Sequence, residues 1–122
     1  MRKIKKINLV WLGLLILMIF AGESVSLAAP PALLDAARKG DLKQIQKLLD
    51  SGKDINQRDK TGFTALHWAA MTNKIEVAKF LIKKGADVNI RDSKMNMSPL
   101  DVAQAKGFKD MAELLLKSGA KP

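Results

Sequence analysis

The chain has 122 residues, and its 21 basic against 12 acidic residues give a formal net charge of +9. This length is enough for one small domain. Because cysteine is absent, the sequence excludes disulfides, cysteine-based metal sites and a thiol nucleophile. A basic chain is weakly attracted to acidic partners or to a negative membrane surface, but its charge does not identify a partner.

Residues 1–28 predict a secretory signal peptide. Four basic residues stand within the first six positions, and an apolar run follows from Leu9 to Phe20. Two small residues, Ser26 and Ala28, come next. This order is typical of an export signal, and we expect cleavage after Ala28. The apolar run is shorter than the roughly 20 residues that a membrane-spanning helix needs. The alternative is an uncleaved anchor, which would make the protein a membrane-held adaptor.

Cleavage would leave residues 29–122 as the folded domain. Four basic residues and Glu23 precede that point, so 17 basic and 11 acidic residues remain, with a net charge of +6. The signal predicts a periplasmic or secreted protein, and its short basic start and strongly apolar middle favour a bacterial one. We expect membrane contact only through the signal segment before cleavage.

A two-part pattern recurs three times in residues 29–122. The leucines that open the first halves are Leu33, Leu66 and Leu100, which lie 33 and 34 residues apart. The second halves end in Leu48-Leu49-Asp50-Ser51-Gly52, Leu81-Ile82-Lys83-Lys84-Gly85 and Leu115-Leu116-Lys117-Ser118-Gly119. Such a period indicates stacked structural repeats, none of which can bury its apolar face alone.

Each repeat reads as a pair of short helices. The spacing of Leu66, Ala69 and Ala70 by three and four residues places them on one helical face. Thr64 and Ser98 are good N-caps for the first helices of the second and third repeats. The second helices use runs such as Val77-Ala78 with Phe80-Leu81-Ile82, and glycine follows each of them.

The segment Thr64-Ala65-Leu66-His67-Trp68-Ala69-Ala70, with Gly85-Ala86-Asp87-Val88-Asn89 after it, resembles the ankyrin repeat. The resemblance covers about residues 31–120. It implies an all-α solenoid of about three helix-turn-helix repeats with short β-hairpin loops, at about residues 31–63, 64–97 and 98–122. The first repeat lacks the Thr-Pro-Leu-His start and the last lacks a hairpin, as expected of end caps.

Two hairpin features follow from residue type. Asn96 stands where the preceding repeat has Gly62, and asparagine is the best non-glycine residue at positive φ. Four aspartates recur at the repeat spacing: Asp54, Asp59, Asp87 and Asp92. Aspartate side chains bond local backbone in turns, so we expect these four to shape the hairpins rather than to catalyse a reaction.

His67 is the only histidine. The ankyrin resemblance implies that it hydrogen-bonds the backbone of a neighbouring hairpin. The alternative is a small enzyme, or a metal or haem protein, that uses His67. One histidine cannot build a metal site without further ligands, and no phosphate loop or nucleophile elbow is present. We therefore expect no catalytic, cofactor-binding or metal-binding residue.

The resemblance implies that partners bind the inner, concave face, through hairpin tips and the exposed side of the first helices. Tryptophan and arginine are also over-represented in binding hot spots. The predicted partner-binding residues are Arg58, Lys60, Trp68, Met71, Ile90, Arg91, Lys94 and Met95. The alternative for Trp68 is partial packing between repeats.

The expected function is protein binding without catalysis, with one unidentified protein partner and a monomeric chain. It would be an accessory protein of an envelope enzyme, or an immunity or inhibitor protein against one. Lysines spaced by four, such as Lys43 with Lys47, indicate a solvated outer face. The alternative is binding of nucleic acid or anionic lipid, but the interleaved aromatic residues that stack on bases are absent.

Overall fold

The computed structural model describes residues 31–122. The predicted signal peptide, residues 1–28, lies outside these residues. Within them, six helices form three consecutive pairs. The pairs are α2 (Ala32–Lys39) with α3 (Leu42–Asp50), α4 (Ala65–Met71) with α5 (Ile75–Lys83), and α6 (Pro99–Lys106) with α7 (Lys109–Lys117).

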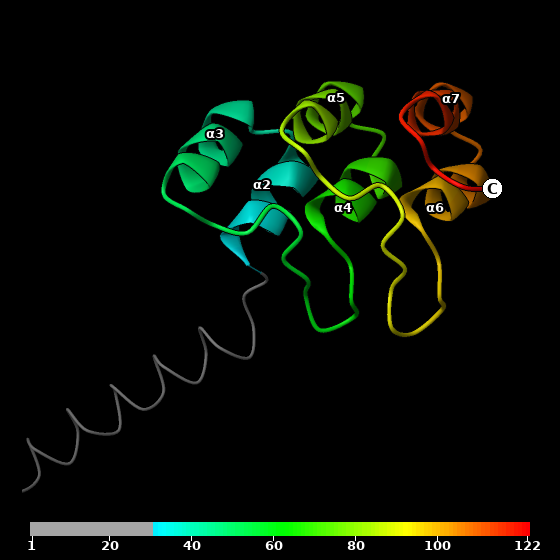
Figure 1. Ribbon diagram of the computed structural model, residues 1–122, viewed down its shortest axis with the longest axis horizontal. Helices are drawn as coiled ribbons and strands as arrows, with labels where there is room; N and C mark the ends of the chain where they lie inside the picture. The colour runs from blue at the N-terminus through cyan, green and yellow to red at the C-terminus, as the bar shows by residue number, and fades with distance from the viewer. Residues whose placement is uncertain (1–30) are drawn as a thin grey trace, which may run out of the picture.

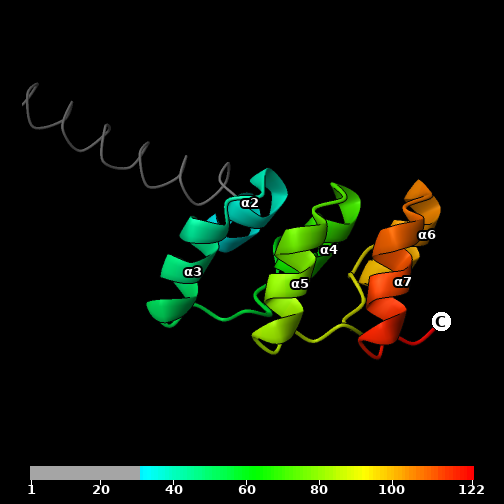
Figure 2. The ribbon, with the colours of Figure 1, turned by 90° about the horizontal axis from the view of Figure 1, so that it is seen from above.

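The three pairs stand side by side in a row, which Figure 2 shows from above. The first helices, α2, α4 and α6, make one layer, and α3, α5 and α7 make the other (Figure 1). Two loops that join successive pairs project from the same side, beyond the layer of first helices. The predicted all-α architecture of about three repeats is confirmed.

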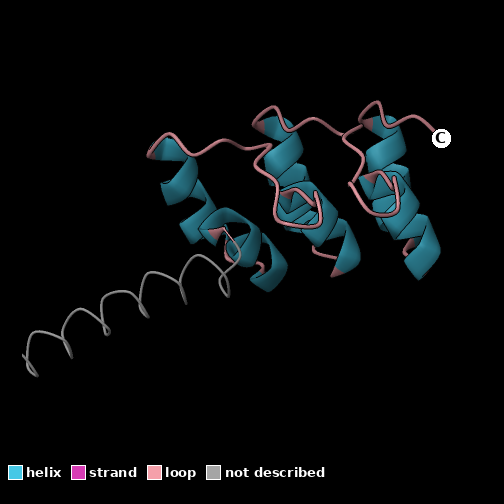
Figure 3. Ribbon diagram, turned by 90° about the horizontal axis from the view of Figure 1, so that it is seen from below, coloured by secondary structure: helices cyan, strands magenta, loops and turns pink. Residues whose placement is uncertain are grey.

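The projecting loops are hairpins in shape but contain no β-strand within residues 31–122 (Figure 3). In the first hairpin (residues 57–63), the Asp59 N–H donates to the Phe63 carbonyl at 2.9 Å. In the second (residues 90–97), the Asp92 N–H donates to the Met97 carbonyl at 3.0 Å. Each hairpin is closed by side-chain contacts more than by a ladder, so the β character expected of these loops is absent.

The caps predicted from residue type are present. The Thr64 hydroxyl accepts from the His67 N–H, and the Ser98 hydroxyl accepts from the Asp101 N–H at 3.2 Å; both form capping boxes. Asn96 has a φ of 55°, which confirms the left-handed conformation expected from its place in the hairpin. The two helices that follow these caps are the ones nearest the hairpins.

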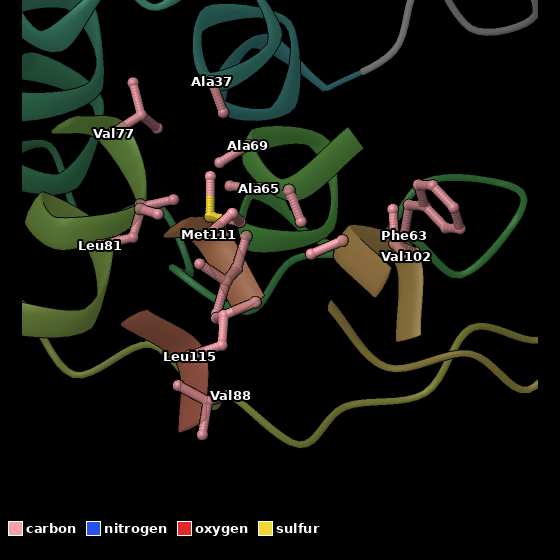
Figure 4. Packing of buried hydrophobic residues seen from close by; sticks show 14 of the residues in the cluster. Ala37, Phe63, Ala65, Ala69, Val77, Leu81, Val88, Val102, Met111 and Leu115 are labelled. Atoms are coloured by element: carbon pink, nitrogen blue, oxygen red, sulfur yellow. The ribbon is translucent and has the colours of Figure 1, made fainter. Parts of the chain in front are cut away.

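A single hydrophobic core lies between the two layers and runs through all three repeats. Alanines in the first helices, such as Ala37 and Ala69, are fully buried and let these helices approach closely. Figure 4 shows larger side chains of the second helices, among them Leu81 and Met111, in the same cluster. Each repeat therefore depends on its neighbours for burial.

The repeats at the two ends differ from the middle one at positions that would face a further repeat. Ala70 is fully buried, whereas Gln104 at the corresponding position of the last repeat is exposed. On the outer layer, Val77 is buried and Gln44 of the first repeat is exposed at the same position. These polar replacements fit the expected end caps.

Asparagine side chains tie each repeat to the next. The Asn56 side-chain oxygen accepts from the Asp87 N–H at 2.9 Å, and the Asn89 side-chain oxygen accepts from the Lys121 N–H at 2.9 Å. Both donors lie just after a second helix, in consecutive repeats. The bonds fix the loops from which the hairpins project.

Candidate protein-docking surface

The first hairpin is built around the Asp59 carboxylate. One oxygen accepts from the backbone N–H groups of Thr61 at 2.8 Å and Phe63 at 3.1 Å, and the other accepts from the Trp68 indole N–H at 3.0 Å. Burial raises the pKa of Asp59, but hydrogen bonds from Thr61, Trp68 and Phe63 outweigh it, so the pKa lies below its usual value. The carboxylate thus holds the hairpin against α4.

The second hairpin repeats this design with Asp92, which is only 4% exposed. One oxygen accepts from the N–H groups of Lys94 at 2.9 Å and Met95 at 2.8 Å, and the other accepts from the Met97 N–H at 2.7 Å. These backbone hydrogen bonds, the one from Met95 foremost, lower the pKa of Asp92 despite burial. The ionised carboxylate fixes the shape of the tip.

The other two recurring aspartates, Asp54 and Asp87, precede the hairpins and bond their own turns. Asp54 accepts from the Asn56 N–H and Asp87 from the Asn89 N–H, each at 2.9 Å. The predicted turn role is therefore confirmed for all four aspartates.

The two hairpin tips are joined directly. The Ser93 N–H donates to the Thr61 carbonyl at 3.0 Å. Gly62 makes this approach possible, because a Cβ at that position would lie 2.5 Å from the Ser93 backbone nitrogen. Gly62 also has a φ of 87°, which L-residues rarely adopt. The tips therefore form one continuous edge, which we call the hairpin edge (residues 57–63 and 90–97).

His67 lies beneath this edge and is fully buried. Its Nε2 lies 2.9 Å from the Met97 carbonyl, so this nitrogen donates and carries the proton. Its Nδ1 accepts from the Thr64 N–H at 3.2 Å. Burial is the main cause that lowers the pKa of His67, so the ring is neutral. The predicted bond to hairpin backbone is confirmed, and neither ring nitrogen is left for a ligand.

Six of the eight predicted partner-binding residues lie on the hairpin edge, and the other two, Trp68 and Met71, lie on α4, where the Trp68 indole donates to Asp59 of that edge. We call this set the docking face. Arg58, Lys60, Arg91, Lys94 and Met95 are exposed, and Trp68, Met71 and Ile90 are partly buried. Their role in binding stays a prediction.

Two of these residues, Trp68 and Arg91, also form hydrogen bonds within the fold that the sequence did not predict. Trp68 donates to Asp59 and meets the Phe63 ring edge-on, with ring centroids 5.5 Å apart. Arg91 donates to the Asn96 carbonyl at 2.8 Å and to Asp101 at 3.0 Å. No sequence motif predicts the bonds of Trp68 to Asp59 and of Arg91 to Asp101, because each joins a hairpin to a helix.

Lys94 and Met95 have no such internal role. Their side chains form no hydrogen bond or ion pair within residues 31–122, although their backbone N–H groups are held by Asp92. Among residues 31–122, Met95 is 67% exposed, more than the other two exposed large apolar residues, Leu42 and Leu116. An apolar side chain is thus presented to solvent on a rigid tip.

Within the described part of the chain, no candidate metal site is found, and two surface hollows lie away from the docking face. Residues 31–122 contain no group of three or more His, Cys, Asp or Glu side chains placed to hold a metal ion. Two open hollows of about 410 and 430 Å³ lie by the outer layer, at the α6–α7 end and beside α3. Neither is lined by a residue of the docking face.

Among residues 31–122, no helix combines the length and apolar character required to cross a bilayer.

The three stacked helix pairs and their projecting hairpins define a short helical-repeat scaffold. The chain is a member of the ankyrin repeat family: a family model described as ankyrin repeats (3 copies) matches residues 33–122. Curated relatives include palmitoyltransferase ZDHHC17 of Danio rerio, 36% identical, and of Homo sapiens, 37% identical. Palmitoyltransferase Hip14 of Drosophila melanogaster is 33% identical.

Each of these matches extends over 90 residues, which is 74% of this chain and 14% of the relative. The chain therefore spans about one seventh of the length of the curated relatives that it matches. In this chain, the matched part consists of ankyrin repeats. Ankyrin repeats are a protein-binding module, and this is the function that the family assigns.

Proposed function

We propose that this protein is an exported, non-catalytic docking module that binds one partner protein through its docking face. The observation that carries the proposal is Met95, exposed on a tip where the backbone N–H groups of Lys94, Met95 and Met97 all donate to Asp92. A backbone that is fixed before binding loses little conformational freedom on association, so the cost of ordering is confined to the side chains. Lys94 beside it and the partly buried Trp68 and Met71 extend the same face.

The proposal includes export to the periplasm or beyond, which rests on the pattern of residues 1–28. In that compartment the module would assist an envelope enzyme, or inhibit a toxic one as an immunity protein. The intact mass of the protein recovered from the envelope tests this directly. Loss of residues 1–28 supports export with cleavage. A full-length mass in the membrane fraction supports a membrane-held adaptor instead.

The absence of catalysis is supported by the site and not by the names of the relatives. The palmitoyltransferases named above are enzymes, but the match spans 14% of their length and supplies no reason to assign their activity here. Within the described residues, His67 has both ring nitrogens engaged. We propose a monomer that acts by occupying a surface of its partner.

The test of docking is affinity capture from the cell-envelope fraction, with the full chain carrying a C-terminal tag. Met95→Glu places a charge at the exposed tip of the second hairpin. Leu42→Glu, on α3 of the outer layer, is a matched control because Leu42 is also exposed, at 38%. We expect one protein to be captured by the wild type and Leu42→Glu and lost with Met95→Glu. Equal capture by both variants would contradict docking at this face.

A further inference from the structure

The hairpin edge has an unequal distribution of charge. It contains four basic residues, Arg58, Lys60, Arg91 and Lys94, and two acidic ones, Asp59 and Asp92. The two carboxylates point inward and accept hydrogen bonds from the hairpin backbone, as described above. The four basic side chains are exposed. The edge therefore presents positive charge to solvent, while its two carboxylates are bound to the hairpin backbone.

The nearby acidic residues on the first helices are also engaged. Asp101 accepts from Arg91 at 3.0 Å and from the Ser98 N–H at 3.0 Å. Asp35 of α2 pairs with Arg38 at 2.7 Å and with Lys39 at 3.0 Å. These carboxylates have little capacity left to bind a basic partner. An incoming protein meets mainly cationic donors on this side of the molecule.

The basic residues are close enough to act together. The backbone bond between Thr61 and Ser93 joins the neighbours of Lys60 and Lys94, so the two lysine Cα atoms are at most roughly 15 Å apart. Flexible side chains from both tips can therefore reach the same acidic segment. Met95 is exposed next to Lys94.

We propose that the hairpin edge binds an acidic, partly apolar polypeptide segment of the partner. Carboxylates of that segment pair with Arg58, Lys60 and Lys94, and an apolar side chain packs on Met95. This inference rests on the proposed docking function and specifies the chemistry of the partner. A polypeptide fits better than a nucleic acid, because the hairpin edge has an exposed methionine and no exposed aromatic ring on which bases could stack.

The test uses fluorescence anisotropy with a labelled peptide of glutamates and leucines, about 12 residues long and so roughly 40 Å when extended. A peptide with lysine in place of every glutamate, and a single-stranded oligothymidine of equal charge, are the comparison probes. The protein is the full chain as the producing cell processes it. The acidic peptide is expected to bind, with affinity falling as salt rises, and the basic peptide is not.

Two double variants with equal charge change locate the binding. Arg58→Glu with Lys94→Glu reverses the hairpin edge, and Lys43→Glu with Lys47→Glu reverses two exposed lysines of α3. None of these four side chains has a hydrogen bond or ion pair within residues 31–122. We expect at least about a 10-fold loss of peptide affinity for the first pair, from two rim charges reversed, and less than about 2-fold for the second.

Equal losses in the two double variants would overturn the inference, because binding would then follow net charge alone. No binding of the acidic peptide at low salt, or tighter binding of the oligothymidine, would also overturn it. Unchanged melting temperatures confirm that each variant is folded. If the peptide fails but capture of an envelope protein still depends on Met95, the docking function stands and the acidic segment does not.

Discussion

Replacement of His67 by alanine tests the structural role of the one histidine. The ring is fully buried, donates to the Met97 carbonyl, accepts from the Thr64 N–H and stacks on Phe63 with centroids 4.9 Å apart. It therefore connects α4 to both hairpins at once. Alanine can make none of these contacts.

The magnitude follows from what the alanine leaves behind. Two buried backbone groups lose their partners, at about 1–3 kcal/mol each when left unsatisfied. Removal of a large buried side chain adds about 2–4 kcal/mol. Water entering the space would satisfy part of this, so we expect His67→Ala to lower the free energy of unfolding by about 3–5 kcal/mol in total. A three-repeat solenoid should lie at the low end of about 5–15 kcal/mol, so little stability would remain.

Urea denaturation followed by circular dichroism measures this loss, with Lys94→Ala as a surface control expected to change stability by less than about 0.5 kcal/mol. A loss below about 1 kcal/mol for His67→Ala would refute the structural account. A variant that kept its melting temperature but lost a measurable activity would instead support the alternative of a catalytic His67.

Three further predictions concern the same region. Burial lowers the pKa of His67 below 6.5, the value of the unfolded chain, so the unfolded state takes up the proton first as the pH falls. Urea midpoints should therefore fall as the pH drops below 6.5. A flat profile in this range would contradict a buried neutral ring. Gly62→Ala should cost about 1–3 kcal/mol, because its Cβ meets Ser93 and its φ is positive; calorimetry showing an unchanged melting temperature would be inconsistent with the joined tips. Asp92→Asn should cost about 1–3 kcal/mol, because an amide nitrogen would face a backbone N–H donor, whereas Asp54→Asn keeps an acceptor and should be nearly neutral in the same denaturation assay.

Much of this fold could be predicted because its causes are local in sequence. The caps at Thr64 and Ser98, the left-handed Asn96 and the turn aspartates each depend on a residue and its near neighbours. The repeat spacing then places equivalent residues in equivalent surroundings. The bond from His67 to hairpin backbone came from the ankyrin resemblance.

The contacts that escaped prediction join different elements. Trp68 and Arg91 were expected as contact residues, and their exposed parts keep that prediction open. Their bonds to Asp59 and to Asp101 depend on how a hairpin folds back on a helix, which no spacing in the sequence reveals. The hairpins were expected to have β character, but each is closed mainly by an aspartate and not by a strand ladder. Trp68→Ala or Arg91→Glu would therefore disturb structure as well as binding.

The most direct test of the central claim is photo-crosslinking in the producing cell, with a photoreactive amino acid in place of Met95. The control carries it in place of Glu76, whose side chain is 76% exposed on α5 of the outer layer. The account predicts a single protein adduct from position 95 and none from position 76. No adduct from position 95, or the same adduct from both positions, would contradict docking through the hairpin edge.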